Sequence, residues 1–291
     1  MNAGSTMKAL EEILAIARSV GWGASYLLRS YYQADINEGN LEIKDKKDGP
    51  VTSADLAVNH YILDKLKSSL GDDDFAYMSE ETYKSQSPEH FSKPWIWIID
   101  PLDGTRDFID KTGEYAIHIA LIKDKRPVLA IVACPEAEKL YYATLGGGTF
   151  AETRDGKVTP IKVSERNQAE DLTLVVSRTH RDQRFNQLLE HLPCNKQKFV
   201  GSVGCKIATI IEQDADVYIS LSGKSAPKDW DMAAPELILT EAGGQFTHFD
   251  GSPLQYNTGD VNQWGGLMAS NGHCHTQLCQ EAERILAQID N

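Results

Sequence analysis

Acidic side chains occur in four short stretches of the sequence where a chain reversal or the end of an element is expected. The stretches are SEETY with Glu80, DPLDGT with Asp100 and Asp103, VTSAD with Asp55, and DWD with Asp231. Mg²⁺ prefers oxygen ligands, and a proline-containing turn at a strand end can direct two carboxylates, and the Leu102 carbonyl between them, at one point. The four stretches together predict a site for divalent cations.

Each stretch also has an ordinary structural interpretation when it is taken alone. DPLDG is a favourable β-turn, and TSAD is a capping box in which Thr52 caps a helix and Asp55 bonds back to it. Adjacent glutamates are usually solvated. Gly104 and Thr105 follow at a predicted helix or turn start, where backbone N–H groups could hold a phosphate oxygen. We predict that Arg106 and Asp107 are surface residues.

The apolar pattern predicts the elements that must position these groups. Helical spacing predicts a long helix over residues 10–31, weakened by Gly21 and Gly23, and a second helix beginning near Ser53. Apolar runs between residues 94 and 164, separated by turn residues, predict a mostly antiparallel sheet. After residue 168 short strands alternate with helices. We predict an α/β (α+β) fold with an N-terminal lobe over 1–168 and a C-terminal α/β lobe over 169–291.

Composition limits the classes of partner. The 291 residues carry a formal net charge of −13, which disfavours attraction to nucleic acid or an anionic membrane and also disfavours a nuclease or polymerase module. Five irregularly spaced cysteines indicate free thiols, and the first residues contain no secretory or membrane-spanning pattern. The Cys/His spacing in NGHCHTQLC does not match a closed zinc site. We predict a cytoplasmic protein with a small-molecule substrate, and the sequence does not determine its oligomeric state.

Three stretches resemble the signature blocks of the inositol monophosphatase superfamily of Mg²⁺-dependent, lithium-sensitive phosphatases. They are SEE, WIIDPLDGT and WDMAAPELILTEAGG, preceded in the expected order by DGPVTSAD. The resemblance covers nearly the whole chain and implies a layered α/β/α/β/α fold that binds two or three Mg²⁺ ions between its lobes. It implies metal ligation by Glu80, Asp100, the Leu102 carbonyl, Asp103 and Asp231.

The same resemblance implies that Asp55 and Thr105 activate the attacking water. From the residues alone, Asp55 is equally well explained as a helix-capping residue or as a residue that both caps and accepts a proton.

Later segments are similar to the 3'(2'),5'-bisphosphate nucleotidases, which hydrolyse 3'-phosphoadenosine 5'-phosphate to AMP and phosphate. These segments are VVSRTHRD, VGSVGCKIATIIEQDADVYIS and KDWDMAAPELIL. The similarity implies substrate contacts from Gly104, Thr105, Ser177, His180, Ser202, Lys206 and Asp231. Cys205 departs from the pattern because a polar residue often precedes the lysine. Arg178 and Lys224 could add positive charge, although each alone is equally well explained as a surface residue.

We therefore expect a Mg²⁺-dependent phosphatase that removes the 3'-phosphate of a nucleotide bisphosphate in sulfur metabolism. One alternative is a phosphatase of the same superfamily that acts on inositol phosphates or sugar bisphosphates. Another is a non-catalytic nucleotide or Mg²⁺ sensor, which the competent side chains at all implied positions disfavour.

Overall fold

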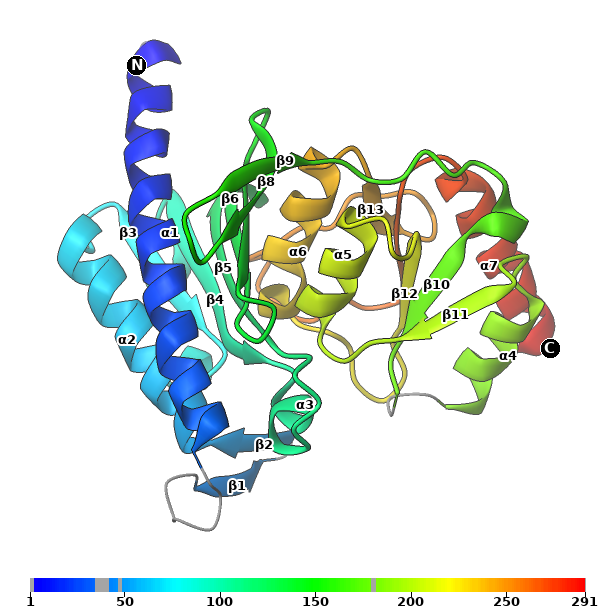
Figure 1. Ribbon diagram of the computed structural model, residues 1–291, viewed down its shortest axis with the longest axis horizontal. Coiled ribbons are helices and arrows are strands. Elements are labelled where there is room, and N and C mark those ends of the chain that lie inside the picture. The colour runs from blue at the N-terminus through cyan, green and yellow to red at the C-terminus, as the bar shows by residue number, and fades with distance from the viewer. Residues whose placement is uncertain (1–2, 35–41, 47–48, 179–181, 291) are drawn as a thin grey trace.

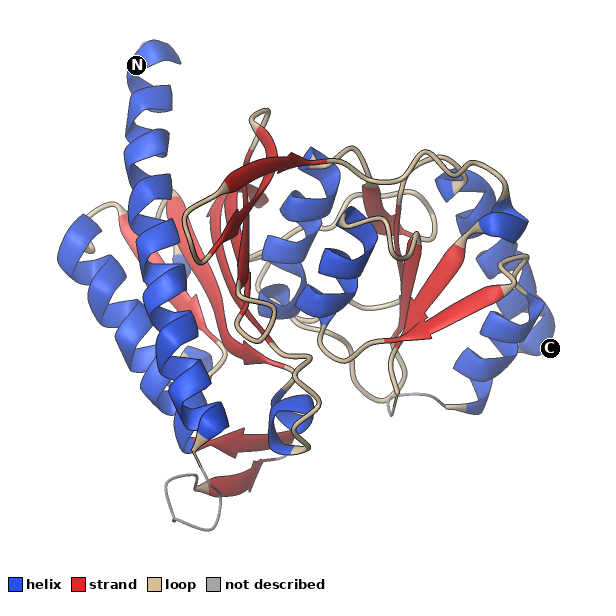
Figure 2. Ribbon diagram, viewed as in Figure 1, coloured by secondary structure: helices blue, strands red, loops and turns tan. Residues whose placement is uncertain are grey.

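Helices and sheets alternate in five layers. The computed structural model describes residues 3–34, 42–46, 49–178 and 182–290. Two helices cover a seven-stranded sheet, two further helices separate it from a five-stranded sheet, and a last pair covers the outer face of that second sheet (Figure 1). Figure 2 shows the alternation by element type. The predicted α/β/α/β/α arrangement is confirmed.

The first layer contains α1 (Ala3–Gln33) and α2 (Ser53–Leu70), and the hairpin of β1 (Ile43–Lys46) and β2 (Gly49–Thr52) precedes α2. The helix α1 continues through Gly21 and Gly23, the two residues predicted to weaken its middle. A Cβ at Gly21 would lie 2.9 Å from side-chain atoms of Ile131 and Leu140, and one at Gly23 would lie 1.8 Å from the Tyr61 hydroxyl. The glycines let α1 pack closely against the sheet and α2, which offsets their helix cost of about 1 kcal/mol each.

The first sheet follows the chain order from β3 to β9. Its strands are β3 (Phe75–Ser79), β4 (Trp95–Asp103), β5 (Ala116–Lys123), β6 (Arg126–Cys134), β7 (Lys139–Thr144), β8 (Gly148–Thr153) and β9 (Val158–Ile161). β3 and β4 are parallel, and each later neighbour pair is antiparallel. The mostly antiparallel sheet expected from the apolar runs is therefore present.

The second sheet is mixed, with the order β11-β10-β12-β14-β13. Its strands are β10 (Thr173–Val176), β11 (Lys196–Phe199), β12 (Val217–Leu221), β13 (Gln245–His248) and β14 (Gly266–Ser270). The inner helices are α5 (Val203–Ile211) and α6 (Asp229–Glu241), and the outer helices are α4 (Gln183–His191) and α7 (His275–Ile289). The short helix α3 (Thr105–Ile109) directly follows β4.

The middle layer joins the two halves of the chain. Apolar side chains of α5 and α6, such as Ile207 and Leu237, belong to one buried cluster that includes Ile98 of β4 and Val175 of β10. The facing sides of the two sheets therefore share one hydrophobic cluster. Among the described residues, no helix has the length and apolar character needed to cross a membrane.

Candidate active site

A β-bulge at the end of β4 brings two acidic residues to the same face of the sheet. Asp100 lies opposite His118 and Asp103 opposite Ala116, so three steps along β4 match two steps along β5. Residues three positions apart on a regular strand face opposite sides, and a bulge removes this alternation. The Leu102 N–H donates to Asp100 Oδ1 at 3.0 Å, which stabilises the irregular DPLD segment.

A third carboxylate reaches the same point from α6. Asp231 lies in the first turn of α6, and its Oδ2 accepts the Lys228 N–H at 2.6 Å. One carboxylate oxygen from each of Asp100, Asp103 and Asp231 lies within 4.8 Å of the others. This is the one group of three or more His, Cys, Asp or Glu side chains in the described ranges that could hold a metal ion, so NGHCHTQLC forms no such group there.

Burial and mutual repulsion perturb the pKa values of these acids. Burial, followed by the charges of Asp231 and Glu81, raises the pKa of Glu80 to about 8. Burial and the neighbouring Glu80 charge raise the pKa of Asp100 well above its usual range. Burial and Asp103 raise the pKa of Asp231 to about 6. All three shifts indicate negative charge concentrated in a low-dielectric site.

Asp103 differs from the other acids of the cluster. Burial alone would raise its pKa, but the nearby His118 and a hydrogen bond from the Gly204 N–H hold the pKa below its ordinary value. Gly204 N donates to Oδ2 at 2.8 Å, and His118 Nε2 lies 3.2 Å from the same oxygen. The histidine contact is short but is not aligned as a hydrogen bond.

The donor set fits a hard divalent cation. Carboxylate oxygens are the ligands that Mg²⁺ prefers. A cation would offset both the burial of the charges and the mutual repulsion that raise the pKa values of Glu80, Asp100 and Asp231. The Leu102 carbonyl accepts the Thr105 hydroxyl at 3.3 Å, so this predicted neutral ligand lies beside the start of α3.

Asp55 uses its two carboxylate oxygens for different contacts. Oδ2 accepts the Thr52 N–H at 2.7 Å and the Thr52 hydroxyl at 2.6 Å, which completes the predicted capping box of α2. Oδ1 accepts the Thr105 hydroxyl at 3.2 Å. Burial raises the pKa of Asp55 to about 6. Capping of α2 and contact with Thr105 are therefore compatible in one side chain.

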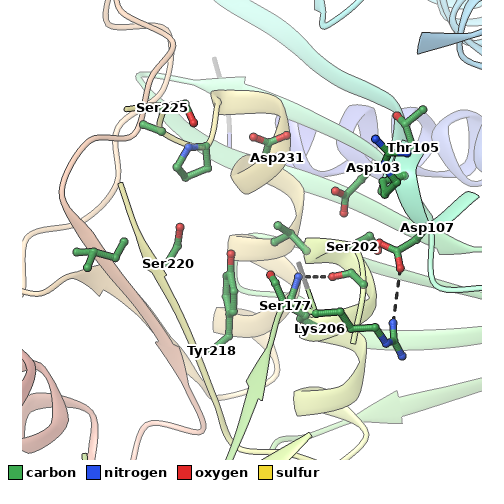
Figure 3. Close-up of a pocket in the computed structure, with 18 of the residues that line it drawn as sticks. Asp103, Thr105, Asp107, Ser177, Ser202, Lys206, Tyr218, Ser220, Ser225 and Asp231 are labelled. Atoms are coloured by element: carbon green, nitrogen blue, oxygen red, sulfur yellow. Dashed lines mark hydrogen bonds and ion pairs between the residues drawn. The ribbon is translucent and has the colours of Figure 1, made fainter. Parts of the chain in front are cut away.

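A cleft of about 1070 Å³ opens over the carboxylates. In Figure 3, Asp103 and Asp231 face each other, with Ser177, Ser202 and Lys206 below them. The predicted site residues that line the cleft are Glu80, Asp103, Gly104, Thr105, Ser177, Ser202, Lys206 and Asp231. The other predicted site residues that the structure describes, Asp55, Asp100 and Leu102, are buried. The predicted contact from His180 lies outside the described residues.

Two basic side chains of the cleft already have protein partners. Lys206 is 3% exposed, its ammonium group donates to the Gly201 carbonyl, and burial lowers its pKa. Arg178 forms a two-pronged ion pair with Glu114, which also accepts the Gly201 N–H at 2.7 Å. The basic side chains of Lys206 and Arg178 thus line the cleft as expected, and both contact neighbouring protein groups there.

The prediction that Asp107 is a surface residue is wrong. Its half-buried carboxylate lines the cleft, lies 3.5 Å from Arg178 Nη1, and is 2.5 Å from the point where a Cβ on Gly201 would stand. The short helix α3 directs Asp107 towards the loop before α5. Arg106 is exposed as predicted, although it also lines the cleft.

Comparison with known proteins identifies the family. The sequence profile of the inositol monophosphatase family matches residues 9–287. The chain belongs to the inositol monophosphatase family. It is accordingly a metal-dependent phosphomonoesterase, and its buried aspartate triad is a suitable metal site.

Related sequences within this family include bacterial nucleotidases. The chain is 29% identical over 253 residues to the 3'(2'),5'-bisphosphate nucleotidase CysQ of Aggregatibacter actinomycetemcomitans, covering 87% of this chain and 88% of the relative. It is 32% identical over 251 residues to CysQ of Buchnera aphidicola, covering 86% and 88% of the two chains.

Solved structures of the inositol monophosphatase family have the same fold. An IMPase from Thermotoga maritima matches with a TM-score of 0.76 at 23% identity and covers 95% of this chain and 98% of its own. Inositol monophosphatase from Anabaena matches with a TM-score of 0.75 at 23% identity, covering 95% and 97%. At this identity the likeness establishes the fold.

Two residues beside the family's motifs were not predicted. His118 interrupts the apolar run EYAIHIALI and lies against Asp103. Glu114 lies in the loop before β5 and holds both Arg178 and Gly201. A polar residue inside a buried strand is a usable signal for His118, whereas a glutamate in a polar loop provides none.

Proposed function

We propose that this chain is a Mg²⁺-dependent 3'(2'),5'-bisphosphate nucleotidase that hydrolyses 3'-phosphoadenosine 5'-phosphate to AMP and phosphate. The observation that carries the proposal is the contact of the Thr105 hydroxyl with the Asp55 carboxylate at 3.2 Å, beside a buried cluster of three aspartates. The relatives named as CysQ nucleotidases support the choice of substrate.

The side chains divide the chemical work. Asp100, Asp103 and Asp231, with Glu80 and the Leu102 carbonyl, would hold the cations, which supply charge neutralisation and Lewis acidity for phosphate hydrolysis. The Thr105 hydroxyl donates to Asp55, so its oxygen is left to accept a hydrogen bond from the attacking water. As the water oxygen bonds to phosphorus, the water proton passes to Thr105 Oγ1 while the Thr105 hydroxyl proton passes to Asp55 Oδ1. The ester oxygen leaves as an alkoxide, whose charge a bound cation would neutralise until it takes a proton from solvent.

The rest of the cleft suits a nucleotide. Its volume is sufficient for a ligand larger than a single phosphate group. Hydroxyls of Ser177 and Ser202 and basic groups of Arg178, Lys206 and Lys224 line it, and such groups are usual partners of phosphate and ribose. We propose that these residues, with His180, contact the nucleotide, while the Gly104 and Thr105 segment contacts the reacting phosphate.

Phosphate release from three substrates tests the proposal. Purified protein with Mg²⁺ is assayed on 3'-phosphoadenosine 5'-phosphate, inositol 1-phosphate and fructose 1,6-bisphosphate, with EDTA as the metal-free control. We expect the highest kcat/KM on the nucleotide. A preference for inositol 1-phosphate would contradict the substrate assignment, and nucleotide binding without phosphate release from any of the three would indicate a sensor.

Asp100→Asn tests the metal site in the same assay. We expect loss of nearly all activity with the fold retained, because the carboxylate lies in the acidic cluster rather than in an apolar contact. Asp64→Asn, at an exposed position of α2, is the matched control and should keep full activity.

A further inference from the structure

His118 lies between two of the segments that carry acidic ligands. It is 0% exposed, in the middle of β5, directly opposite Asp100 on β4. Its Nδ1 donates to the Trp230 carbonyl at 3.1 Å, and its Nε2 lies 3.2 Å from Asp103 Oδ2. One buried ring therefore contacts the acidic end of β4 and the first turn of α6.

The contact with Asp103 depends on the close approach of α5. The Gly204 N–H donates to the same Oδ2 at 2.8 Å. A Cβ at Gly204 would lie 2.4 Å from His118 Nε2 and 2.6 Å from the Ala116 Cβ, so only glycine permits this arrangement. Among the described contacts, Asp103 Oδ2 faces two nitrogen groups of the protein.

The contact with Trp230 acts on the other side of the cluster. Trp230 directly precedes Asp231 in the first turn of α6, and its ring packs against Tyr83 with centroids 5.6 Å apart. The Nδ1 hydrogen bond therefore fixes the backbone next to a second ligand. Carboxylates that repel one another at short range must be held in place by contacts of this kind.

We propose that His118 is a positioning residue that fixes Asp103 relative to Asp231 for the binding of divalent cations. The inference rests on the proposed metal-dependent function of this cluster. Residues that contact a metal-ligating side chain without binding the metal themselves typically change metal affinity by about 10–100-fold when they are replaced.

Three substitutions separate the two contacts of the ring. His118→Gln places an amide nitrogen near the position of Nε2 and retains a nitrogen group towards Asp103. His118→Asn places one near Nδ1 and retains a donor towards the Trp230 carbonyl. His118→Leu removes both nitrogen groups at similar volume, and His60→Gln, at an exposed position of α2, is the control.

Mn²⁺ binding in the absence of substrate provides a readout that does not depend on activity. The Kd is measured by electron paramagnetic resonance, and thermal unfolding without metal is measured in parallel. We expect the Kd to be at least about 10-fold weaker for His118→Leu, which loses both contacts, and to be weakened less for His118→Gln and His118→Asn, which each keep one. The loss of affinity should not follow the change in metal-free stability.

Unchanged Mn²⁺ affinity in folded His118→Leu overturns the inference. If that variant does not fold, unchanged affinity in both the Gln and the Asn variant overturns it instead. Failure to hydrolyse 3'-phosphoadenosine 5'-phosphate, with Mn²⁺ binding still dependent on His118, would count against the proposed function and not against the role of His118.

Discussion

Replacing Asp55 with asparagine separates the two roles that its carboxylate combines. Oδ2 accepts two hydrogen bonds from Thr52, and Oδ1 accepts the Thr105 hydroxyl. An asparagine in the same rotamer keeps a carbonyl oxygen at the position of Oδ2 and places an NH₂ group against Thr105. The cap of α2 is retained, but the acceptor for a proton from water is lost.

The expected magnitudes differ for activity and stability. Removing a general base lowers the rate by about 10²–10⁴-fold, which corresponds to about 3–5 kcal/mol of activation free energy. The free energy of unfolding of Asp55→Asn should stay within about 1 kcal/mol, the usual size of a single hydrogen-bond change. Asp55→Ala should lose as much activity and also about 1–3 kcal/mol of stability, because it leaves the buried Thr52 N–H without its acceptor.

The assay pairs kcat for phosphate release at saturating Mg²⁺ with unfolding in urea. Asp64→Asn on the same helix is the control for both measurements. A kcat of Asp55→Asn within tenfold of the unsubstituted enzyme would refute the proton-acceptor role. Equal stability of the Asn and Ala variants would show that the capping contacts do not stabilise α2.

Three further predictions concern the cleft, the outer layer and the metal. Arg178→Ala should raise KM for the nucleotide about tenfold or more with kcat little changed, because one charge-assisted contact is lost. The control is Arg184→Ala, which removes a similar ion pair with Asp290 away from the cleft. An equal rise in KM for both variants would contradict the prediction. His275 is 4% exposed, and burial lowers its pKa to about 4, so it contributes stability above pH 6.5 that is lost as the pH falls towards 4. Between pH 7 and pH 5 the unsubstituted protein should lose about 2 kcal/mol more unfolding free energy than His275→Asn. The exposed control His60→Asn should show the same pH dependence as the unsubstituted protein. Mg²⁺ at about 100 times its Kd should add about 2.7 kcal/mol to the free energy of unfolding and raise Tm by several degrees. The same Tm in calorimetric scans with Mg²⁺ and with EDTA would count against metal binding at the cluster.

The hydrogen bonds of His275 explain why its neutral form is favoured. Ser270 Oγ accepts the Gly272 N–H at 3.0 Å and lies 2.8 Å from His275 Nδ1, to which its hydroxyl donates when the ring proton is on Nε2. Thr247 Oγ1 donates to the His248 carbonyl at 2.6 Å and therefore accepts from Nε2 at 2.8 Å. A proton added at Nδ1 would point at the hydroxyl hydrogen of Ser270, which already donates to Nδ1, so this hydrogen bond would be lost.

Features that depend on neighbours in the chain were predictable from the sequence. The capping box predicted the start of α2 at Ser53, and the structure places the helix there. The apolar run before Asp100 predicted a buried strand, which is β4. Local spacing contains this information because propensity, capping and alternation each act over a few residues.

Features that depend on contacts between distant segments were not predictable in the same way. The packing of Gly21 and Gly23 requires the positions of the first sheet and α2. The placement of Asp107 in the cleft requires the loop before α5, and the role we propose for His118 requires α6. A propensity scale describes the average behaviour of each residue type, whereas the contacts of these residues depend on segments that are distant in the sequence.

The shared middle layer has a consequence for synthesis of the chain. The inner face of the first sheet is covered by α6, which ends at Glu241, whereas the last strand of that sheet ends at Ile161. At about 5–20 residues per second, the roughly 80 intervening residues take on the order of 4–16 s to emerge. During that interval the nascent sheet exposes apolar side chains that have no partner yet. We expect the ribosome-bound chain to depend on chaperones until α6 has been made, and fragments that end near residue 168 to aggregate.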